Sequence, residues 1–144
     1  MPKIFHVTVK ALIVVDDKVL LLKKPTDDGD FYWDAPGGRV DAHETPDQTL
    51  VRELGEELPT LADYTAGGVV HTTCVQQYAR EMPDVGLYFV FVRVDAEPFE
   101  LQLSDEHAGH GWFSKDQIRS LVQYKDSAVK QSYHEALTLL FNGS

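Results

Sequence analysis

Two glycines precede an unusually acidic stretch of this sequence, which reads APGGRVDAHETPDQTLVRELGEELPT from residue 35 to residue 60. Between residues 44 and 57, five carboxylates accompany a single cation, Arg52. These carboxylates are Glu44, Asp47, Glu53, Glu56 and Glu57. The last three are spaced i, i+3 and i+4, so a helix would place them on one face, where like charges repel. The pattern leaves two interpretations open: a solvated acidic face and a site for cations.

Divalent cations bound between these carboxylates would reconcile the cluster with a stable helix. Oxygen ligands without histidine or cysteine favour Mg²⁺ or Mn²⁺ over zinc, and Mg²⁺ binds through few protein ligands, with water and phosphate completing its shell. Gly37 and Gly38 permit close approach of a ligand, and their carbonyl groups are further candidate oxygen ligands beside the helix. His107 and His110 lack the additional ligands that a zinc site needs, so we interpret them as incidental.

The helix that must position the carboxylates has clear end signals. Thr45 is a good N-cap, Pro46 suits the first helical position, and Gln48 completes a capping box. Pro59 pushes the residue before it out of the α region, so the helix should end at or before residue 58. An apolar stripe on the other face would bury the helix, and it comprises Leu50, Val51, Leu54 and Leu58.

Other segments alternate between strand-like and helix-like patterns. Strands are predicted over residues 7–15, 19–24, 67–79, 85–94 and 112–113, and helices over 115–122 and about 127–141. The first two strands should form a hairpin, and residues 97–111 a loop. Cys74 is expected to be a buried strand residue. Strands between helices indicate an α/β or α+β fold with a mixed sheet packed by helices on two sides.

Length and charge restrict the class of protein further. The 144 residues suit one domain, residues 1–144, with a real core. The net charge of −10 argues against binding to nucleic acid or to an anionic membrane, because both need a cationic surface. The sequence shows neither a signal peptide nor the ~20-residue apolar run of a membrane helix. We therefore expect a soluble cytoplasmic protein.

The acidic stretch resembles the signature of the Nudix hydrolases. That signature is Gly, five residues, Glu, seven residues, Arg-Glu, an aliphatic residue, any residue, Glu-Glu, any residue, Gly and an aliphatic residue. Here it reads Gly38, Glu44, Arg52-Glu53, Leu54, Gly55, Glu56-Glu57 and Leu58. Every charged position matches at the correct spacing, but Pro59 replaces the glycine and Thr60 the final aliphatic residue.

The resemblance implies an α/β/α sandwich that hydrolyses a nucleoside diphosphate linked to another moiety, with Mg²⁺ or Mn²⁺. It implies that Arg52 holds a glutamate of the signature in place, with Glu44 behind the ligands. Glu106, or its neighbour Asp105, would come from a later loop as an extra metal ligand or general base, unless it is an ordinary loop acid. The implied metal ligands are Glu53, Glu56, Glu57 and the Gly37 carbonyl.

The substrate is a small nucleotide on this interpretation, and its identity stays open. Candidate substrate-binding residues are Lys23 or Lys24, Arg39, Trp33 and Tyr78. A tyrosine such as Tyr78, eighteen residues beyond Thr60, is similar to one in the diadenosine polyphosphate hydrolases. A nucleoside triphosphate pyrophosphatase fits equally well, and a non-catalytic nucleotide-binding domain is the alternative from another class. We expect a monomer or a homodimer.

Overall fold

The computed structural model describes residues 3–26, 29–77, 81–103, 107–121 and 128–142. Its elements are β1 (Ile4–Val15), β2 (Lys18–Pro25), β3 (Phe31–Asp34), β4 (Gly37–Arg39), α1 (Pro46–Glu57), β5 (Tyr64–Val75), β6 (Val85–Ala96), β7 (Gly109–Phe113), α2 (Lys115–Arg119) and α3 (Ala128–Asn142). Glu106, Asp105 and Tyr78 lie outside the described residues.

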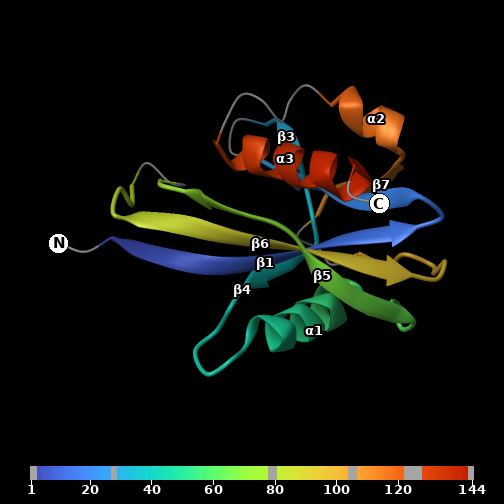
Figure 1. Cartoon of the computed structure of the whole chain (residues 1–144), viewed down its shortest axis with the longest axis horizontal. Coiled ribbons are helices and arrows are strands. Elements are labelled where there is room, and N and C mark those ends of the chain that lie inside the picture. The colour runs from blue at the N-terminus through green and yellow to red at the C-terminus, as the bar shows by residue number, and fades with distance from the viewer. Residues whose placement is uncertain (1–2, 27–28, 78–80, 104–106, 122–127, 143–144) are drawn as a thin grey trace.

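One mixed sheet forms the centre of the molecule. Its strands run in the order β3-β2-β1-β6-β5, with β4 paired to β1 and β7 paired to β2. The long β1 and β6 are parallel, and the other pairs are antiparallel. Helix α1 covers one face of the sheet, while α2 and α3 lie on the other (Figure 1). The predicted sandwich with a mixed sheet between helices is confirmed.

The apolar run in β1 is explained by burial on both of its faces. Val9, Ala11 and Ile13 belong to a core cluster that includes the buried leucines of α1. Leu12 and Val14, which point the opposite way, belong to a second cluster with the buried residues of α3. A strand buried on both faces is apolar at successive positions rather than at alternate ones, as the sequence indicated.

The turns at the ends of β1 and α1 follow from their sequences. Asp16 and Asp17 both have positive φ, as a two-residue type I′ hairpin turn between β1 and β2 requires. At α1 the predicted capping box is present, with Thr45 and Gln48 bonded reciprocally. The helix ends at Glu57, and the Leu58 N–H donates to the Leu54 carbonyl at 2.9 Å. The predicted stop before Pro59 is confirmed.

Some predicted elements differ from the observed ones. β5 starts earlier, at Tyr64, and β7 begins at Gly109 inside the predicted loop, because Gly109–Phe113 pairs with β2. Helix α2 ends at Arg119, three residues short of its predicted end. Cys74 lies on a strand as predicted but is exposed, since its neighbour Val75 takes the buried side. Among the described residues, no helix is long and apolar enough to cross a bilayer.

Candidate active site

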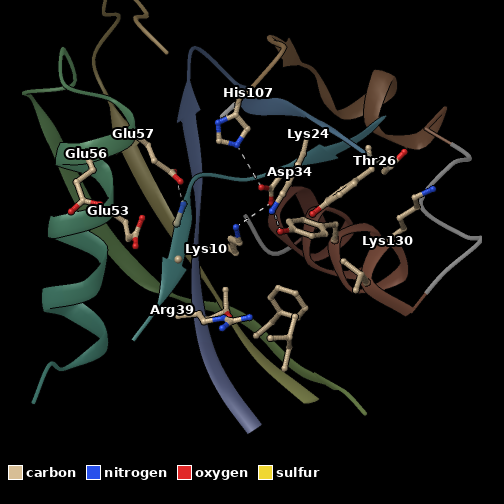
Figure 2. A pocket seen from close by; sticks show the side chains of 18 residues that line it. Lys10, Lys24, Thr26, Asp34, Arg39, Glu53, Glu56, Glu57, His107 and Lys130 are labelled. Atoms are coloured by element: carbon tan, nitrogen blue, oxygen red, sulfur yellow. Dashed lines mark hydrogen bonds and ion pairs between the residues drawn. The ribbon is translucent and has the colours of Figure 1, made fainter. Parts of the chain in front are cut away.

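A cavity of about 860 Å³ lies between α1 and α3 at the surface of the sheet. The glutamates of α1 form one side, together with Gly37 and Gly38 at the start of β4, which we call the glycine turn. Helix α3 forms the other side (Figure 2). Lys10 of β1 and Asp34 of β3 lie between these sides. The cavity therefore includes the predicted ligand residues Gly37, Glu53, Glu56 and Glu57.

The conformation of Gly37 brings the glycine turn against α1. Its φ of 147° is one that side-chain-bearing residues rarely adopt, and an added Cβ would lie 2.0 Å from the Val9 carbonyl oxygen. The Gly37 N–H donates to Glu57 Oε2 at 2.9 Å. Glycine at this position thus lets the turn pack on β1 while its amide holds the carboxylate of Glu57.

Gly38 makes room for the second carboxylate. A Cβ at Gly38 would lie 2.3 Å from Glu53 Oε1, so the absence of a side chain allows this carboxylate to sit against the turn. Arg52 Nη1 donates to the same Oε1 at 2.9 Å. The side chain of Glu56 is 62% exposed, which makes its carboxylate the most accessible of the three.

Arg52 and Glu44 form a paired support behind this carboxylate. Arg52 donates from Nε to Glu44 Oε2 at 2.8 Å and from Nη2 to Oε1 at 3.0 Å, a bidentate geometry. Thr49 Oγ1 also donates to Glu44, at 2.6 Å. These bonds, with Arg52 first, lower the pKa of Glu44 to about 2 and raise the pKa of Arg52. Both groups stay charged, and Arg52 is held in contact with Glu53.

Burial raises the pKa of the two carboxylates at the turn, Glu53 and Glu57, whereas the pKa of Glu44 is lowered. Desolvation raises the pKa of Glu57 to about 7, although the Gly37 N–H and Lys10 lower it in part. Desolvation likewise raises the pKa of Glu53, and Arg52 offsets that effect in part. Partly buried carboxylates without enough positive charge nearby are expected where a cation binds.

The donor set fits a hard divalent cation. Within the described part of the chain, no three histidine, cysteine, aspartate or glutamate side chains are close enough together to enclose a metal ion. Mg²⁺ needs no such cage, because it binds through one or two carboxylates with water and phosphate oxygens. Glu53 and Glu57, held against the backbone of Gly37 and Gly38, offer an oxygen-only set of this kind.

The structure adds a buried polar network that our sequence reasoning missed. Asp34 is 3% exposed and lies 3.2 Å from Lys10 Nζ, and it accepts a hydrogen bond from the hydroxyl of Tyr133. His107, which we interpreted as incidental, lines the cavity with its Nε2 3.7 Å from Asp34 Oδ2. Burial alone would raise the pKa of Asp34, but Lys10 and these neighbours hold it below its usual range. The available signal was Lys10, a charge inside a strand otherwise apolar enough to be buried.

The candidate substrate-binding residues are only partly brought together. Arg39 lines the cavity. Lys24 also lines it, whereas Lys23 points elsewhere, with its Nζ 4.6 Å from the ring centroid of Phe31. Successive strand residues point to opposite sides, so only one of the two lysines could face the cavity. Trp33 packs edge-on against Phe113 at 4.8 Å and is not among the cavity residues.

A mixed sheet between helices, with an oxygen-only set of carboxylates beside two glycines at one cavity, suits a hydrolase that acts on anionic phosphoanhydrides with a divalent cation. The family model described as the NUDIX domain matches residues 4–135. The chain therefore belongs to the Nudix family, and it is a pyrophosphohydrolase that acts on substrates of the nucleotide pyrophosphate type.

Known relatives differ in the substrates that their names state. The bis(5'-nucleosyl)-tetraphosphatase (asymmetrical) of Sus scrofa is 31% identical over 117 residues, 76% of this chain and 74% of the relative. The CTP pyrophosphohydrolase of Escherichia coli is 42% identical over 62 residues, 40% of this chain and 46% of the relative. A solved structure of a possible asymmetric diadenosine tetraphosphate hydrolase from Jonesia denitrificans has a TM-score of 0.76 at 18% identity, covering 99% of this chain and 96% of that chain. This last likeness shows the fold alone.

Proposed function

We propose that this protein hydrolyses a phosphoanhydride bond of a dinucleoside polyphosphate, with Mg²⁺ or Mn²⁺ as its cofactor. The observation that carries the proposal is the pair of carboxylates, Glu53 and Glu57, held against the Gly37–Gly38 turn. Lys24 and Lys130 lie in the same cavity on the side away from α1 (Figure 2). An anionic phosphate chain that spans from the lysines to the carboxylates would meet positive charge at one end and cations bound by the carboxylates at the other.

Each side chain near the turn has an assigned part in this proposal. Glu53, Glu56 and Glu57 would hold the ions, together with the Gly37 carbonyl. Arg52 fixes the carboxylate of Glu53, and Glu44 fixes Arg52 through its bidentate contact. A divalent cation held by these residues would supply charge that neutralises phosphate oxygens and lowers the pKa of a water molecule. Glu106, which precedes His107 in the sequence, is proposed to serve as a further ligand or as a base toward that water.

The choice of substrate class rests on the sequence relationship. The relative from Sus scrofa, named for bis(5'-nucleosyl) tetraphosphate, aligns with three quarters of this chain (76%). The alignment with the CTP pyrophosphohydrolase covers 40% of it, so nucleoside triphosphates are the second class to test. We further propose that the chain acts as a single cytoplasmic domain, as a monomer or a homodimer.

The test is chromatographic analysis of the products formed from a panel of nucleotides, because cleavage of a dinucleoside polyphosphate yields two mononucleotides and no inorganic phosphate. Diadenosine tri-, tetra- and pentaphosphate, the nucleoside triphosphates and an oxidised guanine nucleotide are each incubated with Mg²⁺, with Mn²⁺ and with EDTA. We expect turnover of a dinucleoside polyphosphate with either ion and none in EDTA. Full activity in chelator would overturn the metal mechanism. Tight nucleotide binding without turnover on any substrate would favour the non-catalytic alternative.

A further inference from the structure

Lys10 occupies an unusual place for a lysine. It lies in the middle of β1 and its side chain is only 11% exposed, yet it lines the cavity. In the β1–β4 ladder it is paired with Gly37, and a Cβ on Gly37 would lie 2.9 Å from the Lys10 Cα. The lysine therefore emerges directly beside the turn that holds Glu57. Figure 2 shows it between the α1 glutamates and Asp34.

Asp34 fixes the direction of this lysine. Its Oδ1 accepts from the Ala35 N–H at 2.8 Å and from the Tyr133 hydroxyl, and it lies 3.2 Å from Lys10 Nζ. Groups from β1, β3 and α3 therefore meet at one carboxylate oxygen. The Asp34 carboxylate cannot swing away without breaking contacts to several elements.

Tyr133 anchors this arrangement to α3. It is 1% exposed, and its ring packs edge-on against Phe89 at 5.7 Å and Phe91 at 5.4 Å. Its hydroxyl is held in place by that packing, so α3 sets where Asp34 can sit. A buried ion pair contributes little net stability compared with apolar residues of similar size. Stability alone therefore does not account for a lysine and an aspartate at this position, whereas a role in the cavity does.

We propose that Lys10 is a substrate-binding residue that holds the phosphate group next to Glu57, and that Asp34 and Tyr133 are positioning residues that aim its ammonium group. This inference rests on the proposed function, because it names the protein group that meets the phosphate chain beside the metal ligands. The positioning role of Asp34 can be distinguished from a simple charge effect. Asp34 brings negative charge to an anion site, which would weaken binding unless its orienting effect is larger.

Binding is measured by isothermal titration calorimetry with Mg²⁺ and an ATP analogue whose bridging phosphate oxygens are replaced by methylene groups. Lys10→Met should weaken binding roughly 10- to 100-fold, since a hydrogen bond from a charged donor is lost. KM for the best substrate should rise in parallel, with a smaller change in kcat. Lys18→Met, at the exposed start of β2, is the matched control and should bind like the wild type.

Asp34→Asn separates orientation from charge. Positioning predicts weaker binding of the analogue, although the substitution makes the site less negative. A pure charge effect predicts tighter binding. Tyr133→Phe keeps the ring and removes one hydroxyl, so it tests the positioning role if Asp34→Asn fails to fold. It should weaken binding about two- to tenfold. The control is Tyr88→Phe, which is 38% exposed and lies between the cavity residues Leu87 and Phe89 on β6, so its ring points away.

Unchanged or tighter binding in folded Asp34→Asn or Tyr133→Phe would overturn the positioning roles. Wild-type binding by Lys10→Met would overturn the role of the lysine, as would no binding of the analogue by the wild type. These outcomes are distinct from failure of the proposed function. A wild-type protein that binds the analogue through Lys10 but hydrolyses nothing on the panel would overturn the hydrolase proposal alone.

Discussion

The two sides of the cavity are built in different ways. On the α1 side, Glu44, Arg52 and Glu53 come from a short stretch of chain and are joined by local hydrogen bonds. From the middle of the cavity to its α3 side, Lys10, Asp34 and Tyr133 come from β1, β3 and α3 and are distant in the sequence. The first cluster is arranged by helix geometry, whereas the second exists only because the sheet and α3 have packed.

This difference has an energetic consequence. The charges on the α1 side are partly open to water, and their carboxylates Glu53 and Glu57 have a raised pKa because of desolvation. Burial by itself would also raise the pKa of Asp34, but Lys10 and its other neighbours outweigh that effect and hold the pKa below its usual range. The carboxylates on the α1 side therefore lack enough positive charge nearby, whereas Asp34 has Lys10 beside it. We expect metal-dependent behaviour to be confined to the α1 side.

The largest effect should come from removing a carboxylate at the turn. Glu53→Gln and Glu57→Gln keep the size and one acceptor oxygen but replace the charged carboxylate with a neutral amide. We expect turnover to fall by orders of magnitude with the fold retained, as judged by circular dichroism, because the cation site is lost. Glu81→Gln, in an exposed turn, serves as the control. Wild-type kcat in either glutamine variant would assign the metal to other residues.

The next effect concerns the support behind Glu53. Arg52→Lys retains a positive charge but cannot reproduce the bidentate contact with Glu44 while also reaching Glu53. We expect a 10- to 100-fold loss of kcat/KM or of metal affinity, roughly the size seen when groups behind metal ligands are changed. Arg119→Lys on α2, whose side chain is 65% exposed, should have no effect. Equal activities would mean that charge alone is sufficient at position 52.

A smaller effect should appear in stability against pH without metal. The folded-state pKa of Glu57 is raised from 4.5 to about 7, so its contribution to stability is fully present below about pH 4.5 and is lost as the pH rises through 7. The loss is at most on the order of 3 kcal/mol for such a shift, at about 1.4 kcal/mol per pKa unit, and partial exposure makes it smaller. In EDTA, Glu57→Gln should therefore be more stable than wild type at pH 8, with the difference vanishing near pH 4.

Denaturant unfolding of both proteins across that pH range provides the measurement. Adding Mg²⁺ should reverse the order at pH 8, since the ion binds the ionised wild-type carboxylate and stabilises the folded state. If wild type and Glu57→Gln lose stability in parallel between pH 5 and pH 8 in EDTA, desolvation of Glu57 is not the cause.

The smallest effect is expected at the departure from the family signature. Pro59 follows a helix that already ends at Glu57, and no ligand atom belongs to it. Pro59→Gly should leave turnover within a few-fold and lower the free energy of unfolding by about 0.4–1 kcal/mol, because glycine increases the freedom of the unfolded chain. A large gain in kcat from this one change would show that the natural turn impairs the α1 side.

Much of the α1 side was predictable from sequence because its determinants are local. The capping box and the stop before Pro59 are each encoded within a few residues of where they act, and both were found where expected. The family resemblance implied that Arg52 holds a glutamate of the signature in place, with Glu44 behind the ligands. The structure places Arg52 in contact with both Glu44 and Glu53. Their roles in catalysis stay predictions.

The position of β7 was harder to predict, because Gly109 and His110 are not residues that favour a strand. They become part of β7 through pairing with Lys23 and Leu22 of β2. The choice between Lys23 and Lys24 had the same origin. The sequence places two lysines at the end of the strand, Lys23 and Lys24. Which of the two faces the cavity depends on how the strand is oriented in the sheet.

By itself, then, the sequence determined the helix that carries the carboxylates, the turn beside it and the apolar strand at the centre of the sheet. These follow from backbone preferences and hydrophobic spacing, which act over a few residues. Only the tertiary structure decided that Lys10, Asp34, Tyr133 and His107 meet at one cavity. Their contacts join segments separated by up to 99 residues, as between Tyr133 and Asp34, and no local rule sets such distances. They arise when β1, β3 and α3 bury their apolar faces together, because that packing fixes where each polar side chain must find its partner.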